Sequence, residues 1–196
     1  MTMPIEATAP PKPHREWFLT LTRRQFFYYD PESYPYDVGE IGHVLANLCR
    51  FGGHLDVAYS VAQHSVLVAR TVEFLRGPND RALLCAALLH DASEAFLLDI
   101  PRPLKRTAVM APYRALEDRV QRAILHTFGL EAYHDHPAIK EADAMMLAAE
   151  KQVLRPPTNF ASVEAPIRPS PVAIHPLSAD EARQLFDDAW RWWGAG

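Results

Sequence analysis

The sequence has no long hydrophobic run, only two cysteines and little net charge. No apolar stretch approaches the roughly 18 uncharged residues that a membrane-spanning helix requires, and the N-terminal segment lacks the apolar centre of a signal peptide. A net charge of −4 is typical neither of a basic nucleic-acid binder nor of an acidic disordered tail. We therefore expect a cytoplasmic globular protein that binds no membrane and no nucleic-acid polymer.

The two cysteines are Cys49 and Cys85, which do not form a CxxC pair and each lie within apolar surroundings. This pattern favours buried free thiols over a disulfide. A chain of 196 residues is long enough to bury a core without disulfides. We expect one domain.

Proline is concentrated in two segments. The first 15 residues are rich in proline and poor in large apolar groups, which predicts a flexible arm (1–15) before a single domain (16–196). Residues 155–176 predict an extended segment over the surface or a lid. Residues 17–29 mix aromatic and β-branched side chains around a polar centre, which predicts a short two-stranded hairpin.

The rest of the chain predicts an all-α bundle. From Asp37 onward, apolar residues recur at the spacing of one buried helix face until Gly52. Pro101 and Pro103 predict a fixed, non-helical loop between two of the later helices. The further expected helices cover residues 57–76, the run from Asn79 or Asp80 to Phe96, 112–128, 137–154 and, after a capping box, 178–193.

Four polar residues interrupt these apolar helices. His90 and Asp91 are neighbours whose side chains point about 100° apart on a helix, so a ligand between them would make them converge. His64 and Asp143 lie among apolar residues in the same way. Two imidazoles and two carboxylates suit one divalent transition metal (Co, Mn, Fe, Ni or Zn) with room for water and substrate. Such an ion acidifies water and polarises a phosphoryl oxygen.

This order of residues resembles the H…HD…D signature of the HD-domain phosphohydrolases, which are α-helical metal-dependent enzymes. Within that family, HDASEAFLLDIPRPLK (90–105) resembles the small bacterial 5′-deoxynucleotidases and the related phage and bacterial deoxynucleotide triphosphohydrolases. The likeness covers about residues 38–155. It implies an HD-domain helical bundle, a small-molecule nucleotide substrate and a homo-oligomer, either a dimer or a larger assembly.

The resemblance also implies roles for residues around the ligands. Glu94 corresponds to a glutamate that orients or deprotonates the attacking water beside the metal, and Asp99 to an aspartate that contacts the sugar. Arg50 and Phe51 correspond to an Arg-aromatic pair that contacts phosphate and sugar. The nucleotidases carry tryptophan where this chain has Phe51, so strict selection for deoxyribose is not implied.

The chemistry of the residues agrees with these roles. Glu94 lies one turn after His90, so on a helix it faces the same side and can serve as a general base, making it a catalytic candidate together with Asp91. Arg50 can fork onto phosphate oxygens, and Lys105, in the proline-fixed loop, adds positive charge for an anion.

Several functions remain open at this point. Hydrolysis of 5′-deoxynucleoside monophosphates is favoured. A deoxynucleoside triphosphate triphosphohydrolase (dATPase-like) that releases tripolyphosphate would need further cations, for which Lys105, Arg106, Arg23 and Arg24 are candidates. A non-catalytic nucleotide or metal sensor would have no need of Glu94. A plain helical scaffold would bury a costly set of polar groups.

The sequence indicates the roles of the remaining histidines and the C-terminal tryptophans less clearly. A second metal would need extra ligands, and a single ion is favoured because no added histidine pair is evident. The histidines considered are His43, His54, His134 and His136. Packing on the bundle or on a second subunit is favoured over base stacking for Trp190, Trp192 and Trp193.

Overall fold

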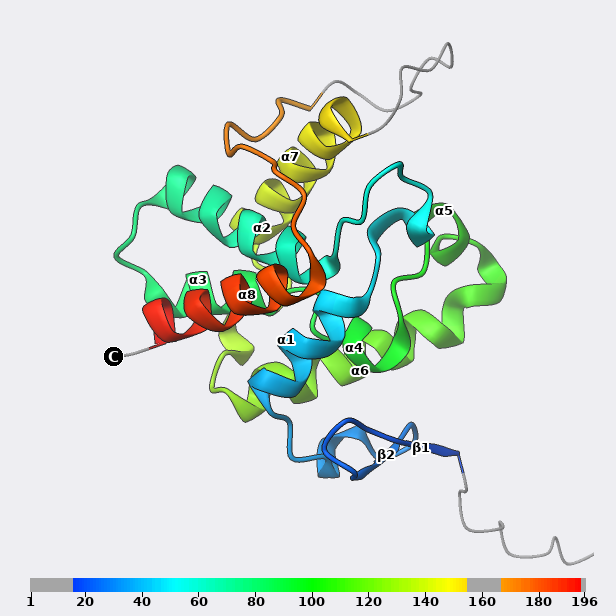
Figure 1. The fold of residues 1–196 in the computed structure, drawn as a ribbon. Helices are drawn as coiled ribbons and strands as arrows, with labels where there is room; N and C mark the ends of the chain where they lie inside the picture. The colour runs from blue at the N-terminus through cyan, green and yellow to red at the C-terminus, as the bar shows by residue number, and fades with distance from the viewer. Residues whose placement is uncertain (1–15, 155–166, 195–196) are drawn as a thin grey trace, which may run out of the picture.

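A computed structural model describes residues 16–154 and 167–194. These residues form an α-helical bundle with a small antiparallel hairpin at one end (Figure 1), which confirms the predicted all-α class and the hairpin. The predicted arm, 1–15, and much of the predicted extended segment lie outside the described residues.

The hairpin pairs β1 (Trp17–Leu19) with β2 (Gln25–Phe27). It is attached to the bundle through Phe26, whose ring is fully buried and stacks on Phe96 with 4.7 Å between ring centroids. Aromatic contacts of this kind stabilise beyond the area they bury. Phe26 therefore joins the hairpin to the domain core.

The bundle contains eight α-helices among the described residues. Five of them begin after a polar residue whose side chain accepts a hydrogen bond from a backbone N–H of the first turn: Asp37, Ser60, Asp80, His136 and Ser178. The helices are α1 (Val38–Asn47), α2 (Val61–Arg76), α3 (Arg81–Leu88), α4 (Glu94–Leu97), α5 (Arg102–Lys105), α6 (Ala111–Thr127), α7 (Pro137–Val153) and α8 (Ala179–Gly194).

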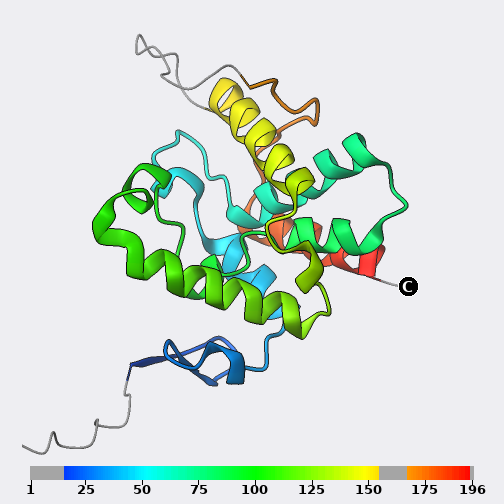
Figure 2. The same ribbon diagram turned by 180° about the vertical axis from the view of Figure 1, so that it is seen from behind.

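Helix α2 is the central element. It packs against α1, α3, α7 and α8, and most of its side chains are buried. Helix α8 lies in front in Figure 1, whereas α6 covers the opposite face in Figure 2. Side chains from α2 and α7 and from the turn after α3 therefore meet inside the bundle.

The prediction of one continuous helix from Asp80 to Phe96 is wrong. Helix α3 ends at Leu88, and α4 begins only at Glu94. The turn between them is held by Gln121 of α6: its side-chain amide donates to the Leu89 carbonyl (2.7 Å), and its oxygen accepts from the Ser93 N–H (3.0 Å). A partner distant in sequence thus satisfies backbone groups that a continuous helix would have paired.

The loop predicted around Pro101 and Pro103 contains one turn of helix, α5, so the expectation of a wholly non-helical loop is also wrong. A proline at the first helical positions costs no hydrogen bond, because those N–H groups have no partner within the helix. The capping box before α8 is confirmed, since Ser178 Oγ accepts from the Glu181 N–H (3.3 Å).

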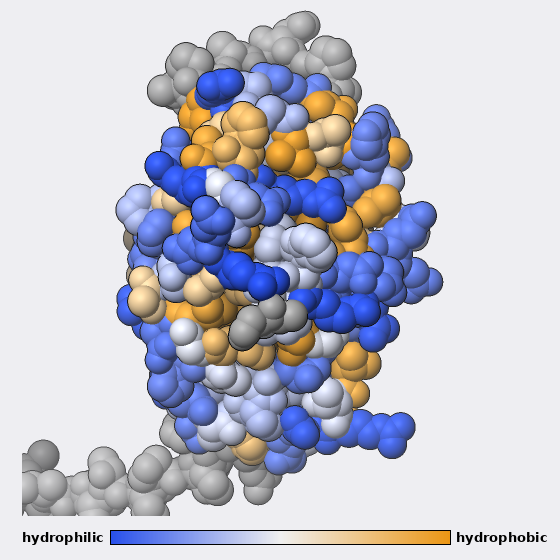
Figure 3. Space-filling model, turned by 90° about the vertical axis from the view of Figure 1, so that its left-hand side faces the viewer, coloured by the Kyte–Doolittle hydropathy of each residue, from blue (hydrophilic) through white to orange (hydrophobic). Residues whose placement is uncertain are grey.

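The C-terminal tryptophans pack mainly on the bundle, as predicted. Trp193 is buried, and the Trp190 ring lies edge-on to Phe128 with 5.2 Å between centroids. Trp192 is 73% exposed. Figure 3 views the side on which α8 ends, where hydrophilic and hydrophobic residues are interspersed. Among the described residues, none of the helices is long and apolar enough to cross a membrane.

The two thiols are free, as predicted, but Cys49 is exposed rather than buried. Burial raises the pKa of the Cys85 thiol to about 11, against a smaller opposing effect of Arg81. Because the thiolate is the reactive form, we expect an aromatic disulfide reagent to titrate Cys49 in the native protein and Cys85 only after unfolding. Cys49→Ser should abolish the fast phase; two native thiols reacting at equal rates would contradict the prediction.

Candidate functional site

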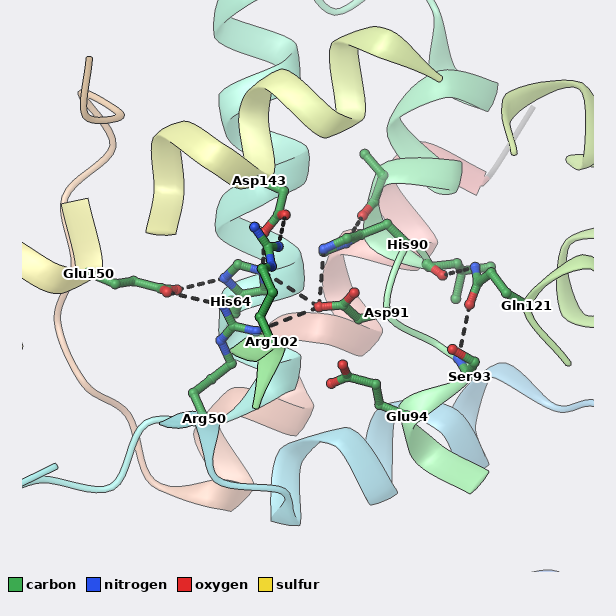
Figure 4. A network of polar contacts seen from close by, with 12 residues as sticks. Arg50, His64, His90, Asp91, Ser93, Glu94, Arg102, Gln121, Asp143 and Glu150 are labelled. Carbon is green, nitrogen blue, oxygen red and sulfur yellow. Dashed lines mark hydrogen bonds and ion pairs between the residues drawn. The ribbon is translucent and has the colours of Figure 1, made fainter. Parts of the chain in front are cut away.

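Three elements bring the four predicted metal ligands to one place (Figure 4). His64 comes from α2, His90 and Asp91 from the turn after α3, and Asp143 from α7. Asp91 Oδ2 lies 3.2 Å from His90 Nε2 and 3.7 Å from His64 Nε2. Asp143 Oδ1 lies 3.3 Å from His64 Nε2. The bend between α3 and α4, missed from the sequence, turns the His90–Asp91 pair inward.

His64, His90 and Asp91 form the compact part of this cluster, with ligand atoms that all lie within 4.8 Å of one another. The Nε2 atoms of both histidines are buried and have no hydrogen-bond partner, whereas His90 Nδ1 lies 2.9 Å from the Ala87 carbonyl and donates to it. Buried nitrogens without partners are costly unless something binds them. This group can hold a metal ion.

Asp143 adds a second carboxylate at the edge of this group. Its Oδ2 accepts a hydrogen bond from Arg102 Nη2 at 2.9 Å, while its Oδ1 faces His64. Arg102 was not predicted as a site residue. The sequence offered no signal beyond its place between two prolines, because the contact joins α5 to α7 across 41 residues.

A second unpredicted residue, Glu150, lies behind His64. Its side chain is fully buried, and its Oε1 accepts from His64 Nδ1 (2.6 Å) and from the Tyr59 hydroxyl (2.9 Å). Its Oε2 accepts from Arg50 Nη2 at 3.2 Å. Burial alone would raise the pKa of Glu150, but His64 and Arg50 outweigh it and lower the pKa to about 2. The sequence did carry a signal for Glu150, because this residue follows Asp143 by two helical turns in the same apolar run.

The opposite charges in the cluster favour one another's ionised forms. Burial opposes ionisation of Asp91, yet the neighbouring His90, His64 and Arg50 hold its pKa well below the usual range. The nearby His64, whose Nε2 lies 3.3 Å from Oδ1, does the same for Asp143. Burial and Arg50 act to lower the pKa of His64, but Glu150 and Asp143 outweigh them and raise it to about 9. Both carboxylates are therefore ionised at neutral pH and available to a cation.

Glu94 stands beside the cluster in a different environment. Its Oε1 accepts from Lys105 Nζ at 3.3 Å, and its buried Oε2 has no partner. Burial, with Asp91 and Asp99 nearby, raises the pKa of Glu94 well above its ordinary value, whereas Lys105 limits the rise. Lys105 also donates to Glu117 of α6 at 2.6 Å. A carboxylate with a raised pKa and an unpartnered oxygen accepts a proton more readily than an ordinary glutamate does.

A cleft of about 510 Å³ opens onto Asp91, Asp143 and Glu94. Its volume is in the range of small-molecule sites. The four predicted substrate contacts line it, and so do several residues that were not predicted to contact the favoured substrate. The predicted ones are Arg50, Phe51, Asp99 and Lys105; the others include His54, Ile100, Arg102, Arg106, Leu147 and Lys151.

Two of the cations considered for a triphosphate lie elsewhere. Arg23 and Arg24 are in the hairpin turn, where Arg24 Nη1 donates to the Pro35 carbonyl (3.4 Å), and neither lines the cleft. Arg106 does line it. Spacing along the sequence did not distinguish these positions, because the hairpin packs at the far end of the bundle (Figure 1).

The other histidines are dispersed. His43 Nδ1 lies 3.3 Å from Arg183 Nη1 of α8. His134 and His136 line a separate hollow of about 120 Å³, which also reaches His90 and Asp143. His134 Nε2 lies 3.1 Å from Asp118 Oδ1, in a group with Asp135 that is largely exposed and could hold an ion by distance alone. The predicted preference for a single ion stays a prediction.

No protein-family model matches the chain. The chain is 38% identical over 135 residues to the uncharacterized protein YfdR of Escherichia coli strain K12, covering 69% of this chain and 70% of that protein. It is 36% identical over 175 residues to the uncharacterized protein RCAP_rcc00048 of Rhodobacter capsulatus, covering 84% and 86%. The extent and level of these matches show that the chain belongs to the same protein family as YfdR and RCAP_rcc00048.

Proposed function

We propose that this chain is a metal-dependent phosphohydrolase of the HD-domain type that acts on nucleotides. The observation that carries the proposal is the convergence of His64 Nε2 and His90 Nε2, both buried and unpartnered, on the carboxylate of Asp91, which lines an open cleft. Asp143 would complete the ligand set. Two imidazoles and two carboxylates suit one Co, Mn, Fe, Ni or Zn ion.

The bound ion would supply Lewis acidity to a phosphoryl oxygen and acidify water. The residues of the chain would do the rest. Glu94 would take the proton of the attacking water at its unpartnered Oε2. Arg50 would hold phosphate oxygens from the wall of the cleft, where its guanidinium stacks 5.7 Å from the Phe51 ring centroid. Asp99 would contact the sugar.

We favour 5′-deoxynucleoside monophosphates as substrates, with nucleoside and phosphate as products. A triphosphate is the second candidate, and a specific observation supports it: three cations line the cleft in addition to Arg50 and Lys105. They are Arg102, Arg106 and Lys151. If the α-phosphorus of a triphosphate lay at the metal, the positive charge of these side chains would attract the outer phosphates, and tripolyphosphate would leave.

The experiment is product analysis by ion-exchange chromatography. The purified protein, loaded with Mn²⁺ or Co²⁺, is incubated with ribo- and deoxynucleoside mono- and triphosphates. Free phosphate from monophosphates identifies a nucleotidase. Intact tripolyphosphate from triphosphates identifies a triphosphohydrolase. No hydrolysis across the panel, with metal bound, would refute the proposal in favour of a nucleotide or metal sensor.

A further inference from the structure

We propose that Glu150 is a positioning residue that couples metal binding at His64 to phosphate binding at Arg50 through one buried carboxylate. This inference rests on the proposed function, since it concerns the same site. It assigns a role to a residue that contacts neither the cleft nor the substrate.

The first reason is that burying the Glu150 carboxylate costs free energy of folding. Its side chain has 0% exposure, and an ionised carboxylate withdrawn from water is destabilising unless every lone pair finds a donor. Apolar side chains of similar volume often stabilise a core as well as a buried ion pair does. The three donors around Glu150 are Arg50, Tyr59 and His64. Stability alone therefore gives a weak reason for this network.

The second reason is the state that Glu150 imposes on His64. An ionised carboxylate only accepts hydrogen bonds, so His64 Nδ1, at 2.6 Å from Oε1, must carry the proton. An ion can then bind at Nε2, where it displaces the second proton of the ring, and Nε2 is the atom that faces Asp91 and Asp143. Helix α7 thus contacts both edges of the imidazole, through Asp143 at Nε2 and Glu150 at Nδ1. Partners of this kind orient metal-binding histidines.

The third reason is that the same carboxylate binds the Arg50 side chain. Oε2 accepts from Nη2 at 3.2 Å, and Nη1 lies 3.7 Å from Asp91 Oδ2. The backbone N–H of Arg50 donates to the carbonyl of Tyr59 at 2.8 Å, so main chain and side chain are fixed by the same neighbours. Figure 4 shows Glu150 beside His64 and Arg50, on the far side of His64 from Asp91. Loss of Glu150 should loosen a metal ligand and the phosphate contact together.

The test compares Glu150→Gln with wild type by calorimetric titration of Mn²⁺, and then of inorganic phosphate into the Mn²⁺-loaded protein. The glutamine keeps the size, but its NH₂ group cannot accept from Arg50 or His64. We expect Mn²⁺ affinity to fall about 10- to 100-fold, the effect typical of losing such a partner, and phosphate affinity to fall as well. Catalytic assays should show a higher KM together with a lower kcat.

Glu40→Gln is the matched control. Glu40 is another buried glutamate, 2% exposed, that accepts from the Tyr34 hydroxyl (2.6 Å) and the Thr22 N–H (2.9 Å) far from the cluster. It should lose thermal stability yet bind Mn²⁺ and phosphate as wild type does. If Glu150→Gln does not fold, ¹H–¹⁵N correlation of His64 in the Zn²⁺-loaded wild type still tests the inference: a proton on Nε2 would overturn it.

The outcomes separate the inference from the function beneath it. Wild-type protein that binds no Mn²⁺ would refute the proposed function and this inference together. Wild-type protein that binds Mn²⁺, with a Glu150→Gln variant of equal affinity, would overturn only the role of Glu150. Weakened Mn²⁺ binding with unchanged phosphate binding would overturn the coupling to Arg50.

Discussion

Replacing Asp91 with alanine is expected to remove both the bound metal and the phosphohydrolase activity. Asp91 supplies the carboxylate of the compact group, with Oδ2 at 3.2 Å from His90 Nε2 and 3.7 Å from His64 Nε2. Without it, two neutral or positively charged imidazoles face each other beside Arg50, which repels a cation. Losing about 4 kcal/mol or more of charge stabilisation from the ion corresponds to at least about a thousandfold in rate.

The measurements for Asp91→Ala are metal content by mass spectrometry after dialysis against Mn²⁺, and turnover of the best nucleotide. Asp118→Ala is the matched control, because Asp118 belongs to the exposed group with His134 and Asp135 that resembles a metal site by distance alone. The control should keep wild-type metal content and rate. Metal retained at wild-type stoichiometry in Asp91→Ala would show that the ion, if functional, is bound elsewhere.

The metal cluster was predictable because its members violate the apolar pattern of the helices that carry them. His64 and Asp143 each interrupt a run of small or aliphatic residues, and a polar residue at a buried helical position signals a partner. Glu150 satisfies the same criterion, yet its role depends on contacts to Tyr59 and Arg50 that lie 91 and 100 residues away. The sequence could therefore mark Glu150 as unusual but could not supply its function.

The break between α3 and α4 was not predictable from local sequence. The run from Ala82 to Phe96 contains no proline or glycine, and alanine and leucine are strong helix formers, so local preference favours continuity. The chain bends because Gln121, on a distant helix, pairs with Leu89 and Ser93. Caps act within one turn, and the start of α3 was predicted from Asp80. The helix expected over 57–76 began too early, because α2 starts only after its cap, Ser60.

Replacing Glu94 with glutamine is expected to keep the metal and lose turnover by about 10²- to 10⁴-fold, the usual contribution of a general base. Glu94 Oε1 lies 3.3 Å from Lys105 Nζ, and its Oε2 is buried and unpartnered. The glutamine has nearly the same shape but cannot accept a proton from water. Lys105 keeps its 2.6 Å hydrogen bond to Glu117, so the cleft should retain its form.

The pH profile makes this prediction specific to proton transfer. Burial and the nearby carboxylates raise the pKa of Glu94, and the ionised form is the base, so wild-type kcat should fall as pH drops through a value above that of an ordinary glutamate. Glu94→Gln should lack this acidic limb, whereas Glu117→Gln should retain it. Wild-type turnover in Glu94→Gln would remove the general-base role, while metal loss in that variant would make Glu94 part of the ion's binding instead. Asp91→Ala thus tests binding of the ion, whereas Glu94→Gln tests proton transfer from the attacking water.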